Sequence, residues 1–196
     1  MTDRPDAAAH TVALAEVPGL AGVYARGATS AARLAVSRRT RPTAPALPGV
    51  ELVVRGVQPD ADHLTRYQRL VGETGSDVLP AGYVHVLTFP VSTALMARTD
   101  FPLSLLGMVH VANRITQVRP VRLGEALDVR VLARGLRPHR SGAQVDLVAE
   151  VTVDGELVWT GTSTYLAKGV HLLPVGPGAD GADETTGGTD DLSAEA

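Results

Sequence analysis

The stretch LPAGYVHVLTFPVSTALM, residues 79–96, decides the fold of this chain. It begins as a Pro/Gly loop, passes Tyr83 and His85, and then becomes almost wholly apolar. The pattern predicts a loop over residues 73–82 and a short helix over residues 88–98. A helix that is apolar on nearly every side has to be buried on nearly every side. The rest of the fold must therefore surround this helix.

The sequence also suggests how this helix begins. Thr88 can cap its first turn. Pro90 is tolerated there, because the first backbone amides of a helix have no helical partner. Tyr83 and His85 then stand at the mouth of the helix.

After the helix, the apolar period changes from 3.6 residues to 2, which indicates β-strands. Residues 143–153 alternate cleanly, with apolar side chains at the odd positions from 145 to 153. Asp154-Gly155 is a strong hairpin signal and leads into the next strand. The predicted strands after the helix span residues 108–118, 125–136, 143–153 and 156–168.

Before the helix, the sequence predicts a strand over residues 50–57 and a helix over residues 61–71. Asp60 is a suitable N-cap for that helix, and Gly72 ends it. These elements precede the apolar helix and complete the compact domain.

Composition divides the chain into three regions. Residues 1–48 form an N-terminal extension, loose over residues 1–17, with a helix over residues 19–36 and a Pro-rich linker. Residues 49–170 form the compact domain. Residues 171–196 are acidic and Gly-rich, cannot bury enough apolar surface to order themselves, and are predicted to be disordered.

The bulk composition excludes several classes of function. The 196 residues carry a net charge of −3 and no cysteine, so a basic nucleic-acid surface, disulfides and thiolate chemistry are excluded. The first ten residues are not a secretory signal, and no apolar run approaches the roughly 20 residues of a membrane helix. The histidines lack metal-ligand spacing, so no metal or cofactor is predicted. A cytoplasmic globular protein is expected.

Together these elements predict an α+β fold, a curved antiparallel sheet wrapped around one central apolar helix. This is the hot-dog architecture. Four strings resemble the MaoC-like acyl-thioester dehydratases and hydratases, most closely the N-terminal half of actinobacterial two-hot-dog 3-hydroxyacyl-thioester dehydratases. They are HLTRYQRLVG at 63–72, YVHVLTFPVSTALM at 83–96, FPLSLLGMVHVANRITQVRPVRLGEALDVRV at 101–131 and VDGELVWTGTSTYL at 153–166. The resemblance runs from about Gly19 to Lys168.

The resemblance implies a role without the family's catalytic pair. The catalytic half of such enzymes carries a Gly-Asp-x-Asn-Pro-x-His loop, whose Asp and His handle the proton and the water. Here GETGSD, residues 72–77, follows the helix, and no Asn-Pro-x-His is present. No residue of this sequence therefore corresponds to the catalytic Asp or His of the family. The chain thus resembles a detached, non-catalytic hot dog that shapes the acyl channel for a catalytic half.

Three substrate-binding candidates lie at the helix mouth, namely Tyr83, His85 and Phe89. A histidine titrates near neutral pH, so His85 can donate to a thioester carbonyl or act as a general acid or base. Alternatively, it caps the helix or binds a loop carbonyl. Glu73 and Asp77 are near in sequence and can orient it as a dyad. The catalytic residues themselves are left unknown.

Asn113 is the fourth substrate-binding candidate. Strict alternation places it with Val109, Val111 and Ile115 on an inner face, and places His110 on the other face, at solvent or a subunit interface. A buried amide needs a hydrogen-bond partner. Asn113 therefore binds an oxygen of the acyl chain, or it pairs with backbone at a bulge.

The remaining candidates are structural or electrostatic. Trp159 and Tyr165 share a face of the last strand and are predicted core residues. Several basic residues flank the strands and either contact the phosphates of coenzyme A or a carrier-protein arm, or form a solvated rim. They are Arg119, Arg122, Arg137, His139 and Arg140.

The sequence favours a subunit of an (R)-specific hydratase/dehydratase acting on 3-hydroxyacyl or 2-enoyl thioesters of coenzyme A or a carrier protein. We expect a homodimer, or a heterodimer with a hot dog that carries the Asp/His loop, because pairing covers an open sheet edge. Three alternatives stay open, since a fold does not fix function. They are a stand-alone hydratase using His85, a thioesterase, and a non-catalytic acyl-binding module.

Overall fold

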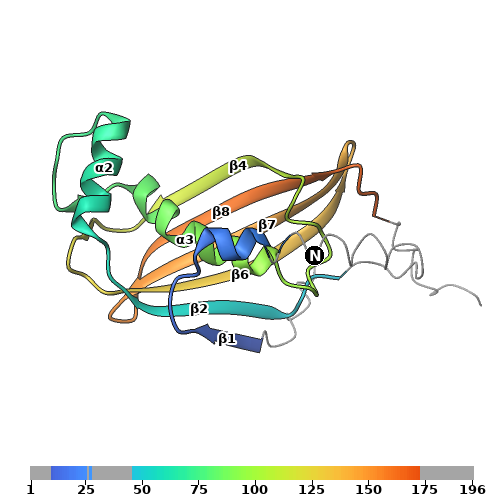
Figure 1. The fold of residues 1–196 in the computed structure, drawn as a ribbon, viewed down its shortest axis with the longest axis horizontal. Helices are drawn as coiled ribbons and strands as arrows, with labels where there is room; N and C mark the ends of the chain where they lie inside the picture. The colour runs from blue at the N-terminus through green and yellow to red at the C-terminus, as the bar shows by residue number, and fades with distance from the viewer. Residues whose placement is uncertain (1–9, 26, 28–45, 173–196) are drawn as a thin grey trace, which may run out of the picture.

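The protein is built on a six-stranded sheet with helix α3 across one face (Figure 1). The structure, a computed structural model, describes residues 10–25, 27 and 46–172. The strand order is β1-β2-β6-β7-β8-β4, so β1 and β4 are the two edges. The strands are β1 (His10–Leu14), β2 (Val50–Val57), β4 (Met108–Gln117), β6 (Leu127–His139), β7 (Gly142–Val153) and β8 (Glu156–Lys168). The predicted α+β arrangement of a sheet around one helix is present.

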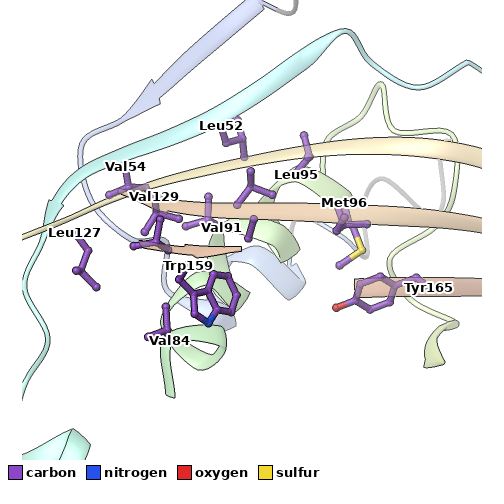
Figure 2. Packing of buried hydrophobic residues seen from close by; sticks show 14 of the residues in the cluster. Leu52, Val54, Val84, Val91, Leu95, Met96, Leu127, Val129, Trp159 and Tyr165 are labelled. Atoms are coloured by element: carbon purple, nitrogen blue, oxygen red, sulfur yellow. The ribbon is translucent and has the colours of Figure 1, made fainter. Parts of the chain in front are cut away.

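The hydrophobic core lies between α3 (Ala81–Met96) and the facing side of the sheet (Figure 2). Val84, Val91 and Leu95 of α3 are fully buried and belong to one cluster with strand residues such as Leu52 and Val129. Full burial of an aliphatic side chain of this size contributes about 1.5–3 kcal/mol. The helix is therefore held in place by contacts on several sides, as its composition predicts.

The predicted bounds of the central helix were wrong. α3 begins at Ala81 rather than at residue 88, so Tyr83 and His85 lie in its first turns and not in a preceding loop. Thr88 does not cap the helix, and its hydroxyl donates to the His85 carbonyl oxygen at 3.0 Å. Pro90 lies inside the helix rather than in its first turn.

Tertiary packing explains the earlier start. Gly82 lowers the local helix propensity, but a Cβ at this position would overlap the Tyr67 hydroxyl of the neighbouring helix. Just before α3, the short strand β3 (Val78–Leu79) pairs with β5 (Val121–Arg122) and fixes the chain. The contacts of the folded protein, rather than local propensity, set the first residue of α3.

The local signals around α2 and the last hairpin were read correctly. α2 spans Ala61–Val71, the Asp60 carboxylate accepts the His63 backbone N–H at 2.7 Å, and Gly72 ends the helix with φ of 73°. Asp154 and Gly155 have φ of 50° and 82°, as a two-residue hairpin turn requires. β2 and β8 have the predicted bounds, and β4, β6 and β7 agree to within a few residues.

The N-terminal region adds a strand that the sequence did not indicate. β1 lies in the segment predicted to be loose and pairs with β2 in parallel, so the sheet is mixed rather than wholly antiparallel. Residues 20–25 are helical, whereas most of the predicted helix over 19–36 and of the tail over 171–196 lies outside the described residues. Within the described ranges, none of the helices is both long and apolar enough to span a membrane.

Candidate functional site

A column of four aromatic rings joins α3 to the edge of the sheet. The His85 ring lies 6.3 Å from the Phe89 ring on the same helix and 5.9 Å from the ring of His110 on β4. The His110 ring in turn stacks on Tyr165 of β8, with centroids 4.8 Å apart and planes at 18°. The column brings together two titratable imidazoles and a phenol from three separate elements.

A β-bulge in β4 places His110 in this column. His110 is opposite Tyr165 on β8, but the next register pair is Ala112 with Thr164, so Val111 is the extra residue. Directly opposed residues of antiparallel strands share a face, and one inserted residue inverts the alternation. The prediction that His110 faces away from Asn113 was therefore wrong.

Asn113 extends the polar character of this face but is not buried. It is opposite Ser163, whose hydroxyl donates to the Asn113 Oδ1 at 3.3 Å. Its side chain is exposed because β4 is an edge strand, so the expectation of a buried amide was wrong. The side chains of His110, Asn113, Ser163 and Tyr165 line one face of the β4–β8 pair, and His85 approaches them from α3.

Burial shifts the pKa values of His85 and Tyr165 toward their uncharged forms. The pKa of His85 is lowered, first by burial and second by the nearby His110. Burial, with a smaller effect of Tyr24, raises the pKa of Tyr165 to about 12. At neutral pH, Tyr165 therefore keeps its hydroxyl proton and His85 favours the neutral imidazole, which can both donate and accept a hydrogen bond.

Tyr83 lies inside the protein at the junction of α2 and α3. Its side chain is 0% exposed, and its hydroxyl lies 3.3 Å from the Asp60 carbonyl oxygen and 3.2 Å from the His63 Nδ1. Burial and the nearby Asp60 raise its pKa, while Arg66 lowers it to a smaller extent. The hydroxyl therefore joins the two helices, and the predicted contact with substrate stays a prediction.

Trp159 fixes the start of α3 against the sheet. Its indole N–H donates to the Ala81 carbonyl oxygen at 3.1 Å, and the side chain is fully buried, as predicted. Ala81 is the first residue of α3, so this bond holds the turn that carries His85. Trp159 therefore positions the histidine without touching it.

The proposed acidic partners of His85 are absent from its surroundings. Asp77 accepts two hydrogen bonds of 2.9 Å from Arg122, and Glu73 is exposed. Within the described residues, neither carboxylate forms a hydrogen bond or ion pair with His85, so the predicted dyad was wrong. The histidine whose ring contacts His85 is His110.

The flanking basic residues do not form one phosphate site. Arg119 and Arg122 precede β6, whereas Arg137, His139 and Arg140 lie at or beyond its far end. The thirteen residues of this strand separate the two groups by roughly 40 Å. Arg119, Arg122 and Arg137 also pair with acidic side chains, which favours the solvated rim over coenzyme A binding.

A sheet folded around one central helix defines the hot-dog class, and this chain has that fold. No protein-family model matches it. A curated relative, 3-hydroxyacyl-thioester dehydratase X of Mycobacterium tuberculosis, is 36% identical over 120 residues, which are 61% of this chain and 43% of the relative. The similarity to hot-dog 3-hydroxyacyl-thioester dehydratases that the sequence motifs indicate is confirmed.

Two crystal structures of HtdX from Mycobacterium tuberculosis give the same result. One has a TM-score of 0.58 and 35% identity, covering 60% of this chain and 51% of that chain. The other has a TM-score of 0.56 and 32% identity, and the match covers 67% of this chain and 54% of that chain. This chain therefore spans about half the length of these relatives.

Sequence reasoning singled out His85 as a candidate but missed its surroundings. It assigned Tyr165 to the core without a functional role, placed His110 on the wrong face and did not single out Ser163. The bulge at Val111 carries no glycine or proline that marks it in the sequence. Its only signal is the three-dimensional register of β4 against β8.

Proposed function

We propose that this chain is a hot-dog subunit of an (R)-specific hydratase/dehydratase that acts on 3-hydroxyacyl and 2-enoyl thioesters. Its similarity to a curated 3-hydroxyacyl-thioester dehydratase supports the substrate class. The observation that carries the proposal is the group formed by His85, His110, Asn113 and Tyr165 between α3 and the β4–β8 pair. The chain would act in the cytoplasm.

The chemistry of this group suits binding better than complete catalysis. Dehydration of a 3-hydroxyacyl thioester needs a base for the proton on C2 and an acid for the departing C3 hydroxyl. The imidazoles of His85 and His110 and the phenol of Tyr165 supply hydrogen bonds, but within the described residues no carboxylate contacts either imidazole. We therefore assign this chain the half that binds and orients the acyl group, and a partner the Asp/His pair.

The exposed edge strand β4 supports the need for a partner. Leu106, Val109 and Val111, in or just before this edge strand, are 48%, 41% and 44% exposed. A long, unpaired edge strand with exposed apolar residues invites pairing with another chain. We propose that a second hot dog, either another copy or a distinct catalytic subunit, covers this edge and closes the site.

A second candidate function is hydration by the chain alone. The lowered pKa of His85 leaves its imidazole neutral at physiological pH, and a neutral imidazole can take a proton from water. His110 would then act as its neighbour in place of a carboxylate. Hydration by this route needs no partner subunit.

The test is hydration of 2-enoyl-CoA by the purified chain, over short to long acyl groups, with thiol release followed in the same samples. The variants are His85→Ala and, as a matched control, His171→Ala, because His171 is exposed and lies outside the column. We expect binding of acyl-CoA without turnover from the chain alone, and turnover once a hot dog with the Asp/His loop is added. The His85→Ala variant should then bind acyl-CoA more weakly.

Three outcomes would contradict this assignment. Hydration by the chain alone that disappears in His85→Ala but not in His171→Ala would make it a stand-alone enzyme. Thiol release without hydration would make it a thioesterase. Acyl-CoA binding without turnover in the presence of any catalytic hot dog would favour a non-catalytic acyl-binding module.

A further inference from the structure

The Tyr165 hydroxyl is a buried polar group with no hydrogen-bond partner among the described residues. Tyr165 is 5% exposed. No other buried side-chain nitrogen or oxygen in the described ranges lacks a hydrogen-bond partner. Nearly all buried hydroxyl groups in proteins are hydrogen-bonded, because an unpaired one destabilises the folded state. An unpaired hydroxyl at this position therefore calls for an explanation.

Tyr165 lies among apolar side chains of the hydrophobic core. Its ring projects from β8 with the hydroxyl oxygen pointing toward the part of the cluster where Trp159 and Val84 lie (Figure 2). Val84 belongs to α3, so the hydroxyl points toward the helix that carries His85. An apolar wall with one free donor suits a ligand that is mostly apolar and carries an uncharged oxygen.

His110 covers one face of the Tyr165 ring. Its exposed ring stacks on the buried ring of Tyr165 at 4.8 Å, at the open edge strand of the sheet. Asn113 and Ser163 lie next to this pair along the same face. A ligand that enters at the β4 edge would pass polar side chains before it reaches the Tyr165 hydroxyl.

We propose that the Tyr165 hydroxyl binds ligand by donating a hydrogen bond to the carbonyl or 3-hydroxyl oxygen of an acyl thioester held between α3 and β4. This inference rests on the proposed function, because it takes the ligand class from there. The phenol is suited to the role, since burial keeps it protonated and no Asp, Glu, Lys or Arg belongs to the column. The column contains no Lys or Arg to pair with a carboxylate or phosphate, which favours an uncharged oxygen.

The experiment compares Tyr165→Phe with the wild-type chain and with Tyr67→Phe, a control whose hydroxyl lies on α2. Isothermal titration measures binding of but-2-enoyl-CoA, 3-hydroxybutanoyl-CoA and unacylated CoA, and thermal melts report stability without ligand. We expect Tyr165→Phe to bind the two acyl thioesters about three- to tenfold more weakly, as the loss of one hydrogen bond predicts, and to bind CoA unchanged. Its free form should melt at the same temperature as wild type or higher, because the unpaired hydroxyl is gone.

The other outcomes separate this inference from the proposed function. Equal affinity of Tyr165→Phe and wild type for both acyl thioesters would overturn the proposed role of Tyr165. It would not contradict the proposed substrate class. A lower melting temperature with unchanged affinity would make the hydroxyl structural, with the same consequence. A wild-type chain that binds neither acyl thioester would overturn the proposed function and this inference together.

Discussion

Trp159 and Gly161 are expected to depend on one another, because the indole ring occupies the space above the glycine. A Cβ at Gly161 would overlap the Trp159 Cη2 and lie 2.9 Å from Cζ3 and 3.1 Å from Cζ2. The ring cannot easily move aside, since it is fully buried and its N–H is bonded to the Ala81 carbonyl oxygen. The substitution Gly161→Ala therefore tests how tightly the start of α3 is held against β8.

The expected energies follow from these contacts. Gly161→Ala should lower the free energy of unfolding by about 1–3 kcal/mol through overpacking. Trp159→Phe should lower it by roughly 2 kcal/mol, about half from the lost hydrogen bond and half from the cavity. In the double variant the smaller phenyl ring leaves room for the new methyl group. The loss of unfolding free energy in the double variant should therefore be smaller than the sum of the two single losses by about 1–2 kcal/mol.

Urea denaturation followed by far-UV circular dichroism measures all four proteins without relying on tryptophan fluorescence. Contacting residues that share a space give non-additive energies, whereas independent sites add to within about 0.5 kcal/mol. Additivity within that limit would refute the packing of the indole over Gly161. A Gly161→Ala variant as stable as wild type would do so as well.

Two further predictions concern the aromatic column. The pKa of His85 is lowered from 6.5 by burial and by His110. As the pH falls, the His85 imidazole is therefore protonated in the unfolded chain before it is protonated in the folded chain. As the pH falls below about 6.5, the stability of the folded chain should decline until the pH has passed the folded-state pKa of His85. Thermal melts from pH 7.5 to 5 should show a shallower decline in melting temperature for His85→Gln than for wild type. An identical decline in both proteins would show that His85 does not cause the effect. Deleting Val111 should remove the bulge but keep His110 opposite Tyr165, because His110, Ala112 and Asn113 then alternate regularly. NMR contacts between the His110 and Tyr165 rings and between Asn113 and Ser163 should therefore both persist. Loss of the ring contacts would mean that Val111 is not the extra residue of the bulge.

Much of the fold could be predicted because its signals are local in the chain. The Asp60 cap, the Gly72 end of α2 and the Asp154-Gly155 turn each depend on neighbouring residues. The alternation over β7 and the apolar character of the central helix likewise indicate which side chains are buried. The start of α3 was misplaced because Gly82 is unfavourable in a helix, yet here it makes room for Tyr67 of α2.

A sheet around an apolar helix, the family resemblance and a histidine near the start of that helix could all be predicted from the sequence alone. The groups that surround His85 depend on how separate elements pack, so they could not be predicted. The side-chain period of a strand is two, so one extra residue at Val111 inverts the face of every residue before it, and no local signal marks that residue. The stacking of His85, His110 and Tyr165 joins three elements far apart in the chain, and its geometry depends on how those elements pack.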